Sequence, residues 1–237
     1  MKTPEALVTE LYICDPVTHI FYDCRIINKQ YGKRLLGIYE QRLDACNVKI
    51  RFAAKSLLAA RKIVKELEHG EFIYFDDESR LGLSYYVESF LIFSRASIDL
   101  AISAYHLYFF GSGNLDSFSD FLKKLPERIG TLPAKSRRFW STVYEAFEAE
   151  HFTWIHALVG KEKGLSLRDL VVHKGMVEID THADDDHRDK FYIGLDRRNE
   201  DYLLLCLNEI FDWIQKIVDR IRKDVLDAEK MLNRTSA

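Results

Sequence analysis

The sequence contains few residues that interrupt helices. Its 237 residues include only 4 prolines and 11 glycines. Both residue types are unfavourable inside a helix, proline because it lacks an amide hydrogen and glycine because it loses the most backbone freedom. Their scarcity favours long helices. A chain of this length can bury roughly 70% of its unfolded surface, so we expect one domain, alone or with an extension.

Cysteine and net charge are also low. The four cysteines, Cys14, Cys24, Cys46 and Cys206, show no CxxC spacing, which argues against a zinc ribbon and a disulfide framework and fits a reducing cytosol. The formal net charge is −3, so no global field draws the chain onto nucleic acid and any contact with RNA must be local. The N-terminus MKTPEALVTELYICD lacks the basic start and apolar run of a signal peptide, and we expect a cytoplasmic protein.

Membrane spans and the common nucleotide and hydrolase motifs are missing as well. The most apolar run, YYVESFLIFSRASIDLAISAYHLYFF, is interrupted by Glu88, Arg95 and Asp99, which a membrane span would rarely tolerate, so it is interpreted as a buried helix. There is no GxxxxGK[ST], GxGxxG, GxSxG or HExxH. Kinase, dinucleotide-binding, hydrolase-elbow and zincin functions have no support, and no cofactor is expected.

Apolar residues spaced by three and four predict several long helices. The first covers residues 29–69 and keeps a heptad spacing for more than four repeats, which predicts packing along another helix. Further helices are predicted from Ser79 or Arg80 to Phe110, from Ala134 to Leu158, and from about Arg198 onward, with a short helix between the second and third. Residues 1–28 are predicted to be irregular or short strand.

The apolar positions that carry these predictions form two seams. The seam of the first helix comprises Leu36, Tyr39, Leu43, Cys46, Ile50, Ala53, Leu57, Ala60, Val64 and Leu67. The seam of the last helix comprises Leu203, Leu207, Ile210, Ile214, Ile217 and Ile221, continuing through Val225 and Ala228 after a shift.

A small hairpin is predicted before the last helix. MVEID (176–180) and KFYIGLD (190–196) are rich in β-formers, and the acidic stretch THADDDHRD would form the tip. The predicted fold class is therefore an all-α bundle with one inserted hairpin. The tip offers oxygen and imidazole ligands for a metal, but no helix or glycine-fixed loop orders them, so a solvated turn is favoured. These side chains are His182, Asp184, Asp185, Asp186 and His187.

The stretch SLRDLVVHKG, residues 166–175, has two interpretations. In the structural one, Ser166 caps a short helix that ends at Gly175, and His173 interacts with the helix dipole. In the chemical one, Arg168, Asp169 and His173 form a phosphodiester site. The imidazole would move a proton, the guanidinium would hold phosphate oxygens, and the carboxylate would orient both. The spacing alone is degenerate, so it does not decide between them.

The RDLVVH stretch resembles the R-x4-6-H motif of the HEPN superfamily, usually written RNxxxH or RDxxxH. SFLIFSRASIDLAISAY is similar to the aromatic-rich first core helix of that superfamily, and the resemblance covers roughly residues 80–225. It implies one helical domain over 29–237, in which 29–69 is an added helix and 80–232 is the core.

Members of this superfamily form four- or five-helix bundles that dimerise, and two copies of the motif meet in one composite cleft. Active members are metal-independent endoribonucleases in which the RNA 2′-hydroxyl attacks the adjacent phosphate. The resemblance implies proton transfer by His173, a phosphate clamp at Arg168 and a polar position at Asp169. It also implies a homodimer, an RNA substrate, an antitoxin or other protein partner, and a role in stress response or defence. Gly175 stands where one toxin subgroup has tyrosine, which disfavours that subgroup, and some members keep the fold without cutting RNA.

Two further groups of residues are candidates. Lys123, Lys124, Arg128, Lys135, Arg137 and Arg138, next to Phe139 and Trp140, could track an RNA backbone and stack a base, although a solvated connection is favoured. Arg95 and Asp99 lie four apart in an apolar helix and are expected to bond each other or the motif region, with a core pair slightly favoured over a role in orienting Arg168 or His173. His106 is interpreted as a packed histidine.

Overall fold

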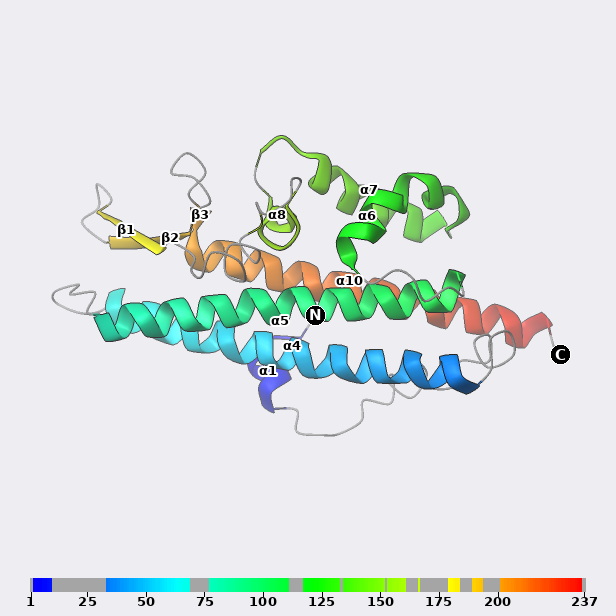
Figure 1. Ribbon diagram of the computed structural model, residues 1–237, viewed down its shortest axis with the longest axis horizontal. Helices are drawn as coiled ribbons and strands as arrows, with labels where there is room; N and C mark the ends of the chain where they lie inside the picture. The colour runs from blue at the N-terminus through cyan, green and yellow to red at the C-terminus, as the bar shows by residue number, and fades with distance from the viewer. Residues whose placement is uncertain are drawn as a thin grey trace. The chain divides into compact units, whose positions relative to one another are not determined.

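The computed structural model is predominantly helical (Figure 1). It describes residues 2–9, 33–68, 77–110, 117–132, 134–151, 153–160, 166, 179–183, 189–193 and 201–235. The chain divides into two compact units, each made of segments that are distant in sequence. Unit 1 comprises residues 1–9, 50–95 and 146–213, and unit 2 comprises residues 10–49, 96–145 and 214–237.

Three long helices contribute residues to both units. They are α4 (Lys33–Glu68), α5 (Asp77–Phe110) and α10 (Leu203–Thr235). The predicted seam of the first helix is confirmed wherever its side chains are described, except that Leu67 is only half-buried. Its buried members are Leu43, Cys46, Ile50, Ala53, Leu57, Ala60 and Val64. In α10 the buried members are Leu203, Leu207, Ile210, Ile214, Ile217, Ile221 and Val225.

The helices α4 and α5 are in contact in each unit. In unit 1, the ring centroids of Phe52 and Phe93 lie 5.1 Å apart. In unit 2, Nη1 of Arg42 donates to the carbonyl oxygen of Ser103 at 3.3 Å. Within unit 1, a Cβ at Gly82 would lie 3.5 Å from Cδ1 of Ile63, so a later residue of α4 meets an earlier residue of α5 and the two helices are antiparallel there.

Shorter helices lie at the N-terminus and between α5 and the strands. They are α1 (Pro4–Thr9), α6 (Phe118–Arg128), the 3-10 turn η1 (Ile129–Thr131), α7 (Ala134–Glu148) and α8 (Trp154–Leu158). Ser117 caps α6, because its hydroxyl accepts the amide of Asp120 at 3.1 Å.

The prediction of one helix from Ala134 to Leu158 is wrong, because the helix stops at Glu148. Side chains that follow the break donate hydrogen bonds to carbonyl oxygens in the last turn of α7. The hydroxyl of Thr153 donates to the carbonyl of Ala146 at 2.9 Å, and Nε2 of His156 donates to the carbonyl of Phe147 at 2.9 Å. Nδ1 of His156 accepts the amide of Thr153 at 3.0 Å, so the turn is fixed on both sides. Thr153 and His156 thus form a capping box that starts α8 as a separate helix.

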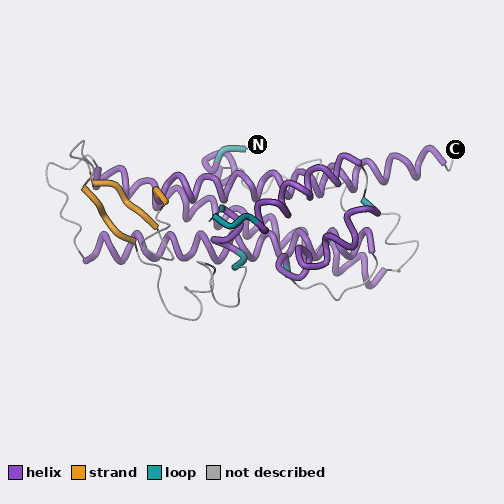
Figure 2. Tube along the Cα trace, turned by 90° about the horizontal axis from the view of Figure 1, so that it is seen from above, coloured by secondary structure: helices purple, strands orange, loops and turns teal. Residues whose placement is uncertain are grey.

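Three short strands precede and adjoin α10. They are β1 (Ile179–Ala183), β2 (Asp189–Ile193) and β3 (Asp201–Tyr202), antiparallel in the order β1-β2-β3 (Figures 1 and 2). The Cα partners include Ile179 with Ile193 and Ala183 with Asp189. Strand β1 therefore extends into the stretch predicted as the tip. The last helix begins at Leu203 rather than near Arg198, because Asp201 and Tyr202 pair with β2.

Each unit has its own core. In unit 1 the indole rings of Trp154 and Trp213 stack with centroids 5.0 Å apart, and Phe90 is fully buried. In unit 2 the ring of Trp140 contacts those of Phe121 and Tyr105, with centroids 4.9 and 5.9 Å away. Within the ranges that the structure describes, no helix is long and apolar enough to span a bilayer.

Candidate functional site

The predicted catalytic residues Arg168, Asp169 and His173 lie outside the described residues. The same holds for the predicted short helix from 167 to 174 and for Gly175. Ser166, at the start of the stretch, is described and is fully buried in unit 1. The phosphodiester site therefore stays a prediction from the sequence.

Arg95 and Asp99, the predicted supporting pair, each bond the end of another helix. In unit 1, Nη1 of Arg95 donates to the carbonyl of Leu158, the last residue of α8, at 2.7 Å. In unit 2, Oδ1 of Asp99 accepts the amide of Phe118, the first residue of α6, at 2.6 Å. Carbonyls at a helix C-terminus and amides at an N-terminus lack partners within the helix. These bonds give both side chains a structural role in fixing short helices to α5.

The predicted RNA-binding residues lie in unit 2, on α6 and at the start of α7. Residues 117–140 hold six cationic side chains but only two carboxylates, Asp120 and Glu127, which contrasts with the net charge of −3 for the chain. The carboxylate of Asp120 already accepts the hydroxyl of Ser117 at 2.7 Å. Five of the cations are exposed, and we call them the cationic set: Lys123, Lys124, Lys135, Arg137 and Arg138.

The sixth cation, Arg128, is half-buried, and its Nη1 contacts Nε2 of His106. His106 is only 2% exposed, which agrees with the prediction of a packed histidine. The imidazole accepts from the permanently charged guanidinium, since Nε2 faces a group that can only donate. Arg128 is therefore tied to α5 more closely than the five exposed cations.

Trp140 cannot stack a base, which was one of the two interpretations of this segment, because its side chain is fully buried. Trp140 shares the inner face of α7 with Ser136 and Val143, which are also buried. Its neighbour Phe139 is half-buried, with ring centroids 5.2 Å from Trp140. Phe118, Phe121 and Trp140 of this segment belong to the core of unit 2, whereas the five residues of the cationic set are exposed.

A buried carboxylate, which the sequence did not single out, fixes the first turn of α7. Asp224 on α10 is 2% exposed and accepts the hydroxyls of Ser136 at 2.5 Å and of Tyr105 at 3.2 Å. It also forms an ion pair with Arg220, one turn earlier on α10. Burial, together with the adjacent Asp224 carboxylate, raises the pKa of Tyr105 well above its usual value. In the sequence, the indication of this buried carboxylate was the position of Asp224 next to Val225, a member of the apolar seam of the last helix.

Ser136 connects this network to the cationic set. It lies between Lys135 and Arg137 in the chain, and its hydroxyl points inward to Asp224. Because a helix places adjacent residues on different sides, burial of Ser136 directs its two neighbours outward. The bond therefore fixes the backbone that carries the cations of α7.

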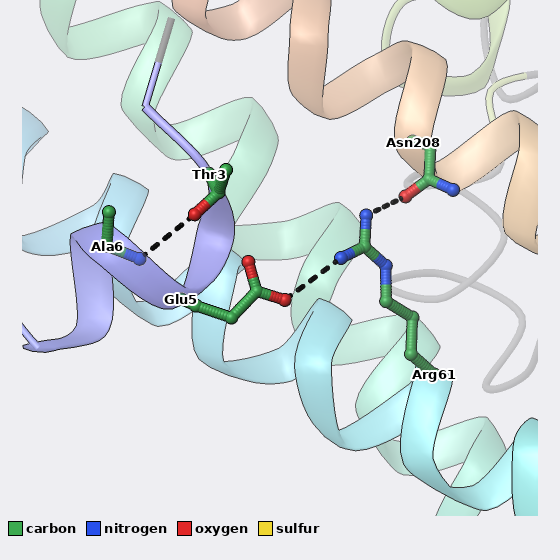
Figure 3. A network of polar contacts seen from close by, with 5 residues as sticks. All are labelled: Thr3, Glu5, Ala6, Arg61 and Asn208. Atoms are coloured by element: carbon green, nitrogen blue, oxygen red, sulfur yellow. Dashed lines mark hydrogen bonds and ion pairs between the residues drawn. The ribbon is translucent and has the colours of Figure 1, made fainter.

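A second polar network joins three elements of unit 1 (Figure 3). Arg61 on α4 donates Nη2 to Oδ1 of Asn208 on α10, and its Nη1 lies 3.4 Å from Oε1 of Glu5 on α1. The amide of Ala6 donates to the hydroxyl of Thr3 at 3.2 Å, which begins α1. A backbone hydrogen bond lowers the pKa of Glu5. The guanidinium of Arg61 is occupied by protein groups, so the network anchors α1.

Thiol and metal chemistry find no support in the described residues. The side chains of Cys46 and Cys206 are buried, and burial raises the pKa of the Cys46 thiol to about 12. Such a thiol is a poor nucleophile, because the thiolate is the reactive form. In the described part of the chain, no three His, Cys, Asp or Glu side chains are grouped to hold a metal. Only the backbone of His182 is described, in β1, and residues 184–188 lie outside the described ranges.

Comparisons of the chain with protein-family models, with curated proteins and with solved structures find no match.

Proposed function

We propose that the chain is a metal-independent endoribonuclease of the HEPN type. The observation that carries the proposal is the RDLVVH stretch, which combines a guanidinium, a carboxylate and an imidazole within six positions. The predominantly helical fold and the exposed cations of unit 2 support it. A role in stress response or in defence against foreign genetic elements would fit this activity, as would control by an antitoxin or another partner protein.

The proposed reaction needs only groups of the chain and of RNA. His173 takes the proton from a ribose 2′-hydroxyl, whose oxygen attacks the adjacent phosphorus, and the bond from phosphorus to the 5′-oxygen breaks. The leaving 5′-oxygen receives a proton from the His173 imidazolium, so the products carry a 2′,3′-cyclic phosphate and a 5′-hydroxyl. Arg168 holds the phosphate oxygens and stabilises their charge in the transition state, and Asp169 orients the other two side chains. In the proposed dimer, two such sets form one cleft.

The cationic set is the proposed contact with the RNA backbone. Exposed lysine and arginine side chains bind phosphates by charge and release counterions, which gives affinity without sequence preference. Trp140 is fully buried and cannot stack a base, so this contact is expected to be mainly electrostatic. Binding by these cations and cleavage by the motif are separate claims, and each has its own test.

The cleavage test uses the purified chain, RNA with single-stranded and structured regions, and EDTA in every reaction. We expect cleavage by the unaltered chain and at least a hundredfold loss with His173→Ala, because a general acid–base group contributes roughly 10²–10⁴ in rate. His151→Ala is the matched control, since His151 is an exposed histidine of the same unit. Cleavage that survives His173→Ala rejects the assignment.

A helical interaction module without catalytic activity is the second candidate. The observation that favours it is a set of large apolar side chains exposed on α5: Leu81, Tyr85 and Ile92. Exposed apolar patches on soluble proteins often mark contacts with other proteins. This candidate predicts that Arg168→Ala and His173→Ala leave every activity and all partner binding unchanged.

A further inference from the structure

The outer side of α5 in unit 1 carries apolar and charged side chains in a heptad pattern. Leu81 is 73% exposed, Tyr85 63% and Ile92 38%. Glu78 is exposed as well, and Glu88 and Arg95 are half-buried. The spacings from one residue to the next alternate between three and four, as in the seam of a coiled coil. We call these six residues the α5 stripe: Glu78, Leu81, Tyr85, Glu88, Ile92 and Arg95.

The other sides of α5 are already used within unit 1. Leu83, Val87 and Phe90 are fully buried and form the core side. Gly82 and Phe93 mark the side that meets α4: a Cβ at Gly82 would lie 3.5 Å from Cδ1 of Ile63, and the ring of Phe93 contacts that of Phe52. Leu81 and Tyr85 are therefore mostly exposed although they are large side chains, and Ile92 is exposed over 38% of its surface.

When two copies of the stripe run in opposite directions, the side chains that face each other are complementary in charge and polarity. In an antiparallel pair of stripes, Leu81 faces Ile92 of the second copy, so two apolar side chains meet. In the same register Tyr85 faces Glu88, which brings a phenol donor to a carboxylate, and Glu78 faces Arg95, which brings opposite charges together. Each of these contacts occurs twice, because a two-fold axis relates the copies.

Other registers lack this agreement. A shift of one heptad in one direction brings Glu78 against Glu88, and a shift in the other direction brings Glu88 against Ile92. A parallel pairing sets Glu78 against Glu78, Glu88 against Glu88 and Arg95 against Arg95. Like charges face each other in the first of these shifts and in the parallel pairing, and the second shift sets a carboxylate against an apolar side chain, so one register stands out.

We propose that the α5 stripe is a homodimer surface on which a second copy of this chain packs its own α5 in antiparallel orientation. The occupant is a second copy because the charges and apolar side chains of the stripe match their own reversed order. This dimer would supply the second subunit that the proposed composite RNA-cleaving site requires, and to that extent it rests on the proposed function. Its test uses no RNA, so the two proposals can fail separately.

Pairs of introduced cysteines test the register. In the double variant Leu81→Cys/Ile92→Cys, each new cysteine faces its counterpart on the other copy, and an oxidised sample should run at twice the 27.7 kDa chain mass. Residues 81 and 92 of one chain lie eleven positions apart, about 16 Å along the helix, beyond the reach of a disulfide. In the proposed register, the two copies of residue 81 are separated by the same length of helix, as are the two copies of residue 92. Each single variant should therefore stay uncrosslinked. The unaltered chain should also stay uncrosslinked, and it controls for the native cysteines. Equal crosslinking of the single variants overturns the register.

Sedimentation or light scattering tests the surface itself. The unaltered chain should be a dimer, and Leu81→Asp should raise the dissociation constant of the dimer at least tenfold, since the two-fold axis places two aspartates in the interface. Leu205→Asp is the matched control, because Leu205 is an exposed leucine of the same unit, 64% exposed, on α10. A monomeric unaltered chain, or a dimer equally tolerant of both substitutions, overturns the proposal.

Discussion

Replacing Asp224 by alanine should destabilise unit 2 strongly. The substitution removes the common acceptor of Tyr105, Ser136 and Arg220. Removing one partner of a buried ion pair costs about 3–5 kcal/mol, because the remaining charge stays away from water. The side chain of Arg220 is 14% exposed, so water partly compensates it and the lower end of that range is expected.

The three partners predict an order of effects. Ser136→Ala loses a short bond to a charged acceptor and should cost about 1.5–3 kcal/mol. Tyr105→Phe loses a bond of 3.2 Å and should cost about 0.5–1.5 kcal/mol. Asp224→Asn keeps an acceptor oxygen at the same place. Its loss of unfolding free energy should therefore lie between the losses for Asp224→Ala and Tyr105→Phe.

The assay is urea unfolding followed by far-ultraviolet circular dichroism at neutral pH. Asp227→Ala is the matched control, because Asp227 is an exposed carboxylate of the same unit on the same helix, and its loss should change the free energy of unfolding by no more than about 0.5 kcal/mol. A loss below about 1 kcal/mol for Asp224→Ala, or a larger loss for Tyr105→Phe than for Asp224→Ala, would refute the reasoning about the buried carboxylate.

Three further predictions concern the helix ends, the cations and the buried thiol. Arg95→Ala should cost about 1–3 kcal/mol and increase hydrogen exchange in α8, because the carbonyl of Leu158 loses its donor; unchanged exchange there would contradict this role. Changing the cationic set to glutamine should weaken RNA binding and flatten its dependence on salt by about 0.7 in the logarithmic slope for each lost phosphate contact, measured by fluorescence anisotropy; an unchanged slope would remove these residues from the interface. The raised pKa of Cys46 stabilises the folded chain fully below the unfolded thiol pKa of about 8.5, and this stability is lost as pH rises toward about 12. Cys46→Ala should remove that part of the alkaline loss in unfolding experiments, and an identical alkaline profile would contradict it.

Periodicity predicted the long helices because their packing repeats along the sequence. Ala53, Leu57 and Val64 are buried where the seam of the first helix places them. In the same way, Ser136, Trp140 and Val143 follow the spacing of a buried face in the helix predicted from Ala134. The neighbouring cations Lys135, Arg137 and Arg138 are exposed.

Contacts between distant side chains and backbone groups could not be predicted from spacing. The break after Glu148 depends on the bonds of Thr153 and His156 to carbonyls of the preceding helix. The burial of Asp224 depends on donors from α5 and α7, which no pattern within α10 reveals. The catalytic assignment to Arg168, Asp169 and His173 stays a prediction, since these residues lie outside the described ranges.

The most direct measurement of the proposed activity is identification of the RNA ends after incubation with the chain in EDTA. Mass spectrometry should find 2′,3′-cyclic phosphate and 5′-hydroxyl ends, and neither should form from a substrate with 2′-deoxyribose at the cleaved position. Ends with a 3′-hydroxyl and a 5′-phosphate, or cleavage of the deoxy substrate, would contradict attack by the 2′-hydroxyl and with it the proposed reaction.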